Sequence, residues 1–170
     1  LPKGSFQLAG RLSQCAYVLL NVGEYSTAEE LLRECLEIQR AKRHDQLIVD
    51  HANAMLGWAL FGQEEYVDAE PLLVSGLDGM MENSEELPTT ARPLFNKTFE
   101  NLISLYEESE KPDQAAKWRK KLEAFRAASP VTHDAKGVES NDKLNGLVQK
   151  FLDKKYVSNV NSIKDRSQLA

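Results

Sequence analysis

Residues 23–32 read GEYSTAEELL, and residues 64–73 read EEYVDAEPLL. A shift of 41 positions superposes the two stretches at a tyrosine, an alanine, a glutamate and a pair of leucines. The same shift carries the apolar pair 19–20 onto the apolar pair 60–61. A fixed period of tens of residues is the signature of a protein built from stacked repeats. The sequence therefore predicts an array of repeated units.

Each repeat is predicted to be two helices joined by a turn. Apolar residues recur every three or four positions through both halves of each repeat, which is the spacing of one helix face. Glycine or proline separates the halves at Gly23, Gly62 and Pro112, and Ser26 or Thr27 is a suitable N-cap for the second helix of the first pair. The last helix is expected to begin at Ala115. We expect an all-α array over residues 1–129, with helix pairs at 6–43, 46–82 and 91–128.

The remaining residues are predicted to form a linker, 130–143, and a C-terminal amphipathic helix with a tail, 144–170. Leu144, Leu147 and Phe151 share one face of that helix. Two interpretations stay open. The helix caps the array by covering three apolar side chains of the last pair, or it enters a groove of this molecule or of a neighbour. Those three side chains are Trp118, Leu122 and Phe125.

Composition excludes several classes of function. The 170 residues carry a formal net charge of −5, and residues 1–129 hold 14 Lys and Arg against 21 Asp and Glu. An acidic body argues against nonspecific nucleic-acid binding, which depends on neutralising phosphates. No apolar run approaches the roughly 20 residues of a membrane helix, and two cysteines are too few for a disulfide framework. We expect a cytoplasmic protein, and because the chain opens with Leu1 we expect a fragment of a longer one.

The sequence contains no recognisable catalytic or metal-binding pattern. His44, His51 and His133 have no partner at zinc-ligand spacing, and the two cysteines do not form a C-x-x-C motif. The grouping of Asp50 with His51 lacks a nucleophile and a Gly-rich phosphate loop. We therefore expect no enzyme activity, no cofactor and no metal.

The repeat resembles the tetratricopeptide repeat (TPR) family. The residues that carry this resemblance occupy corresponding places in the three pairs: Gly23, Tyr25 and Ala28; Leu56, Gly57, Leu60, Tyr66 and Ala69; Leu102, Tyr106, Pro112 and Ala115. The long period is similar to that of kinesin light chains, and the segment AEPLL at 69–73 looks most like arrays attached to bacterial Ser/Thr protein kinases. The resemblance implies a right-handed superhelix whose first helices line a concave, peptide-binding groove.

On this resemblance, twelve side chains are expected along the groove: Ser13, Tyr17, Leu20 and Asn21 from the first pair, His51, Ala54, Trp58 and Phe61 from the second, and Lys97, Glu100, Ser104 and Glu107 from the third. The aromatic members predict a trough that anchors a partner, although the same rings could instead fill the space between neighbouring pairs. Chaperone-binding members hold a terminal carboxylate with lysine, asparagine and arginine. The matching positions here lack that set, so we expect no recognition of carboxylate-ended tails.

These patterns predict a protein–protein interaction module, a scaffold or adaptor that holds a peptide or helix in an aromatic-lined groove. An alternative is a regulatory segment of a larger signalling enzyme, such as a Ser/Thr protein kinase whose catalytic domain lies outside this chain. A homodimer through the array ends or the C-terminal helix also stays open.

Overall fold

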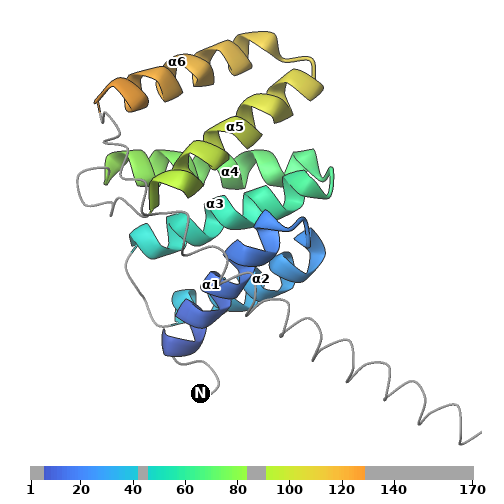
Figure 1. Ribbon diagram of the computed structural model, residues 1–170, viewed down its shortest axis with the longest axis vertical. Coiled ribbons are helices and arrows are strands. Elements are labelled where there is room, and N and C mark those ends of the chain that lie inside the picture. Colours follow the sequence, from blue (N-terminus) through green and yellow to red (C-terminus); the bar gives the residue numbers. More distant parts are fainter. Residues whose placement is uncertain (1–5, 42–45, 84–90, 129–170) are drawn as a thin grey trace, which may run out of the picture. The chain divides into compact units, whose positions relative to one another are not determined.

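The computed structural model describes residues 6–41, 46–83 and 91–128, and these form helices and no strand (Figure 1). The helices are α1 (Phe6–Asn21), α2 (Tyr25–Ala41), α3 (Gln46–Gly62), α4 (Tyr66–Glu82), α5 (Arg92–Glu108) and α6 (Pro112–Ala128). The predicted all-α fold is confirmed. The six helices belong to one compact unit, Leu1–Val131. The predicted linker at 130–143 and helix at 144–170 lie outside the described residues.

Successive helices pack against one another along the chain. Each helix contacts the next one, and α3 also contacts α1 and α5, so the first helices of the three pairs form one row (Figure 1). Among the described helices, α6 packs on α5, and its Lys121 forms an ion pair with Asp78 of α4. Corresponding helices of the second and third pairs begin 46 positions apart, because the connection between α4 and α5 is longer than that between α2 and α3. The row of first helices is the feature that positions the candidate site.

The turn inside each pair has the same backbone geometry. Gly23, Glu64 and Glu110 all have positive φ, at 81°, 65° and 56°. The amide that follows each of them donates to a carbonyl five residues earlier: Glu24 to Leu19 at 2.9 Å, Glu65 to Leu60 at 2.9 Å, and Lys111 to Tyr106 at 2.8 Å. This bond, together with the bond from the amide of the positive-φ residue to the carbonyl three residues earlier, defines the Schellman motif that ends many helices. The helix-turn-helix design is therefore repeated three times in its hydrogen bonds.

Two helix starts differ from the prediction. α2 begins at Tyr25, before the predicted cap Ser26, because the amide of Ala28 already bonds the carbonyl of Glu24 at 3.0 Å. α6 begins at Pro112 rather than at Ala115. Proline fits the first position of a helix because the N–H it lacks would have no partner inside the helix there. In both cases the Schellman turn leads directly into the next helix.

Small residues let α3 and α4 cross closely. A Cβ atom added to Gly57 would lie 2.8 Å from the Leu73 side chain, and one added to Gly76 would lie 2.7 Å from the Cβ of Ala54. One added to Gly79 would lie 2.1 Å from a carboxylate oxygen of Asp50. Such separations are far below ordinary van der Waals contact, so these glycines set the distance between the two helices.

Polar side chains join each pair to the next. Glu29 of α2 accepts a bond of 2.7 Å from Gln63 at the second turn, and Glu70 of α4 accepts bonds from Tyr106 at 2.9 Å and Lys111 at 3.0 Å. Burial raises the pKa of Glu29, but the hydrogen bonds from Gln63 and Arg33 outweigh it and leave that pKa below its usual value. The joint thus favours the ionised form of Glu29, which accepts a bond from the following turn.

The last helix packs through a narrow apolar stripe. Trp118 and Leu122 are buried, and the Phe125 ring lies 4.3 Å from that of Phe95 between centroids. Trp118 also meets Phe99 edge-on at 6.0 Å. These three side chains of α6 therefore have packing partners in α5. Their predicted contact with Leu144, Leu147 and Phe151 involves residues outside the described part of the chain.

Candidate functional site

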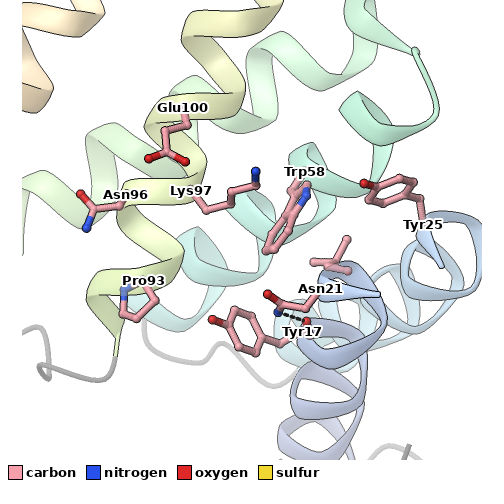
Figure 2. A pocket seen from close by; sticks show the side chains of 9 residues that line it. Tyr17, Asn21, Tyr25, Trp58, Pro93, Asn96, Lys97 and Glu100 are labelled. Atoms are coloured by element: carbon pink, nitrogen blue, oxygen red, sulfur yellow. Dashed lines mark hydrogen bonds between the residues drawn. The ribbon is translucent and has the colours of Figure 1, made fainter. Parts of the chain in front are cut away.

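A pocket of about 430 Å³ lies along the row of first helices (Figure 2). Its lining comes from α1, α3 and α5, together with the first residue of α2. The lining residues are Tyr17, Leu20, Asn21, Tyr25, Trp58, Pro93, Asn96, Lys97 and Glu100. We call this surface the groove. It has the size of sites that take one large side chain or a short stretch of peptide.

Trp58 of α3 forms the floor of the groove. Its indole is only 5% exposed and meets the Tyr17 ring edge-on, with centroids 6.3 Å apart and planes at 77°. Tyr17 and Tyr25 are half-buried. Trp58 therefore fills the space between helix pairs, as one of the two predicted interpretations requires, while the two tyrosines leave aromatic surface open to a ligand.

Tyr25 owes its place in the groove to Gly62. A Cβ atom on Gly62 would lie 2.6 Å from the Tyr25 ring, so only glycine lets the ring rest on the end of α3. On the same side of the groove, the Asn21 amide donates to the Tyr17 carbonyl at 2.6 Å and caps the end of α1. Gly62 was predicted to end α3 and does so. Its second role, which is to leave room for the Tyr25 ring, comes from this contact between helix pairs.

The α5 wall carries the charges of the groove. The Lys97 amine lies 5.7 Å from the centroid of the Trp58 ring, within the range of a cation–π interaction. Arg126 of α6 donates to Glu100 and to the side-chain oxygen of Asn96, both at 3.3 Å. Figure 2 shows Lys97 reaching across from α5 toward the indole. The wall therefore combines one neutralised carboxylate with one amine held over an aromatic floor.

The structure brings half of the predicted groove residues together. Six of the twelve line the groove, namely Tyr17, Leu20, Asn21, Trp58, Lys97 and Glu100. Ser13, His51, Phe61, Ser104 and Glu107 are not among the lining residues. Two of these five side chains have other partners: Phe61 packs on Tyr66 with ring centroids 5.7 Å apart, and Glu107 pairs with Arg119 of α6. His51 lies where burial lowers the pKa of its imidazole.

The prediction for Ala54 was wrong. Ala54 is fully buried against Gly76 in the crossing of α3 and α4, and it is not among the residues that line the groove. Spacing alone did not decide whether this residue faces α4 or the groove, because α3 is buried on nearly every side. A helix apolar all round carries little information about its orientation.

Three lining residues were missed, and two of them had a usable signal. Pro93 and Asn96 precede Lys97 and Glu100 at spacings of three and four, so one helix face contains all four. Tyr25 precedes the predicted helix start at Ser26 and was not among the predicted groove residues. Its recurrence as Tyr66 marked a position with a packing role, but nothing local indicated Gly62 as the contact.

The described residues offer no other site with evident chemistry. They contain no group of three His, Cys, Asp or Glu side chains that could hold a metal ion. Cys35 is buried with its sulfur 3.4 Å from the Ala9 carbonyl, and burial raises the pKa of its thiol. None of the described helices is both long enough and apolar enough to span a bilayer.

Comparison with known proteins adds no identification. No protein-family model matches the chain, and no curated protein matches it significantly.

Proposed function

We propose that this chain is a TPR-like protein–protein interaction module that binds an extended or helical peptide in the groove on α1, α3 and α5. One observation carries the proposal. The groove takes its lining from all three helix pairs, with half-exposed aromatic rings beside an aromatic floor. Aromatic anchors in a largely preformed concave surface are the usual basis of peptide recognition.

The repeat geometry supports the same proposal. Three matching Schellman turns, the close glycine-mediated crossing of α3 with α4 and the polar joints between pairs support a fixed arrangement of the first helices. A surface held in register by neighbour contacts loses little conformational entropy on binding a partner. The two tryptophans, one in the groove and one between α5 and α6, provide built-in reporters.

The test is selection from a phage-displayed library of random dodecapeptides on the full chain. Enriched peptides are then made synthetically, and their binding is followed by the indole NMR signals. We expect the Trp58 signal to shift on titration while the Trp118 signal stays unchanged. The variant Asn96→Tyr, which places a ring in the groove, should abolish binding, whereas Val67→Tyr should not. Val67 is 88% exposed and lies outside the groove, so it is the matched control.

Two results would contradict the proposal. Either no peptide is enriched over selection on an unrelated protein, or the enriched peptides bind Asn96→Tyr as well as the wild type. A shift at Trp118 without one at Trp58 would place the binding surface at the α5–α6 interface instead.

A further inference from the structure

One cation in the groove has no carboxylate partner in the described part of the chain. Lys97 forms no ion pair within the described residues, and its amine lies over the Trp58 ring. By contrast, Glu100 accepts from Arg126 at 3.3 Å, so its charge is already matched. Because Lys97 and Arg126 are positive and Glu100 is negative, these three side chains make the groove locally positive.

This local charge differs from that of the array around it. Residues 1–129 hold 14 Lys and Arg against 21 Asp and Glu. Two other lysines of the third pair have acidic partners: Lys111 pairs with Glu70 and Lys121 with Asp78. An unpaired lysine beside aromatic surface, inside an acidic body, favours an anionic ligand group at this point and disfavours a cationic one.

A second feature of the α5 wall favours the same ligand chemistry. Asn96 accepts from Arg126 through its Oδ1 atom, which leaves its N–H groups to donate to a ligand. The groove therefore presents an ammonium group and amide donors, whereas its carboxylate, that of Glu100, is already bonded. An ammonium group with amide donors beside it suits a carboxylate.

We infer that the peptide held in the groove carries an aspartate or glutamate whose side-chain carboxylate pairs with Lys97. This inference rests on the proposed function and adds a specificity to it. The recognised group is an internal acidic side chain of the peptide, with neighbouring apolar atoms of the peptide against Tyr17. Lys97 then exchanges its contact with the indole for a charge-assisted hydrogen bond.

The test uses the same dodecapeptide library, because peptides fused to the phage coat at their C-terminus present no free terminal carboxylate. Selection is repeated on Lys97→Glu and on Lys117→Glu. Lys117 is exposed on α6, outside the groove, and makes the same change of charge. We expect wild type and Lys117→Glu to enrich Asp or Glu at one fixed position, and Lys97→Glu to lose this preference and enrich Lys or Arg there.

A synthetic peptide with acetylated and amidated ends, taken from the enriched set, then gives the magnitude. Changing its acidic residue to the amide should weaken binding to the wild type by about tenfold. The same change should have little effect on Lys97→Met. Enrichment without acidic preference, or equal losses for both proteins, would overturn this inference and leave the groove proposal standing. If no peptide binds in the groove at all, both fail.

Discussion

Replacing Gly76 by alanine tests whether glycines set the separation of α3 and α4. The new methyl group would lie 2.7 Å from the Cβ of Ala54 and 2.8 Å from its Cα and backbone nitrogen. A flexible side chain could move aside from such a contact, but the backbone of a helix cannot. The two helices would have to separate or rotate, and the buried contacts along their length would loosen.

The magnitude follows from two opposing effects. Overpacking a tight interior contact costs about 1–3 kcal/mol, and a contact with backbone atoms belongs at the upper end. Alanine is a better helix former than glycine by about 1 kcal/mol, which offsets part of this cost. We therefore expect a net loss of about 2 kcal/mol in the free energy of unfolding, or about 6–10 °C in Tm for a unit of this size.

The assay is urea unfolding followed by circular dichroism, with Gly10→Ala as the matched control. Gly10 lies inside α1, it is exposed, and no described atom lies within 4 Å of the place its Cβ would occupy. Here only the helix propensity acts, so Gly10→Ala should stabilise by about 0.5–1 kcal/mol. The reasoning would be refuted if the two variants were equally stable, because Gly76 would then be one more helical glycine without a packing role.

Three further predictions concern the turns, a half-buried histidine and a joint between pairs. Glu64→Gly and Glu110→Gly should each stabilise the fold by about 0.5–1 kcal/mol in thermal unfolding, because both residues have positive φ, which is strained for any residue with a Cβ. Unchanged or lower Tm values would count against this strain. Burial lowers the pKa of His51, so its contribution to stability is complete above about pH 6.5 and is lost as the pH falls from there through the lowered pKa. Wild type should therefore lose more stability than His51→Gln between pH 7 and pH 5, and parallel stability curves for the two proteins would contradict this. Burial and the hydrogen bond to Glu70 raise the pKa of Tyr106 to about 12, so its contribution to stability is complete below about pH 10 and is lost as the pH rises through 12. Tyr106→Phe should lower the free energy of unfolding by about 1 kcal/mol at pH 7. The variant should then lose less stability than wild type on going to pH 12, as measured by urea midpoints.

The positions of the helix pairs could be predicted because the repeated residues play the same role in each pair. Tyr25 and Tyr66 both mark the start of a second helix, and Ala28 and Ala69 are both fully buried in its first turn. Such positions depend on local geometry, which recurs wherever the sequence recurs. The turns were harder to predict, because Glu64 and Glu110 adopt a backbone conformation for which glycine is the usual signal.

The site was only partly predictable, because its key contacts join residues far apart in the chain. Tyr17, Trp58 and Lys97 come from three different helix pairs, and their meeting depends on the crossing angles of α1, α3 and α5. Helical spacing correctly grouped Lys97 with Glu100 on one face. It could not reveal that Trp58 is buried or that Arg126 neutralises Glu100, since both follow from packing between pairs.

The last helix, α6, differs physically from the second helices of the other two pairs, and the difference bears on where a partner binds. α2 packs between α1 and α3, and α4 packs between α3 and α5, whereas α6 packs on α5 and reaches α4 through the Lys121–Asp78 ion pair. Where α4 has the buried Leu73 and Leu77, the positions 46 residues later in α6 are the exposed Arg119 and Glu123. A charged outer face gains nothing from burial against a further apolar surface, and it suits a terminal unit of a stacked array. Half-exposed aromatic surface is found in the groove instead, which favours the groove over the α6 end as the binding surface.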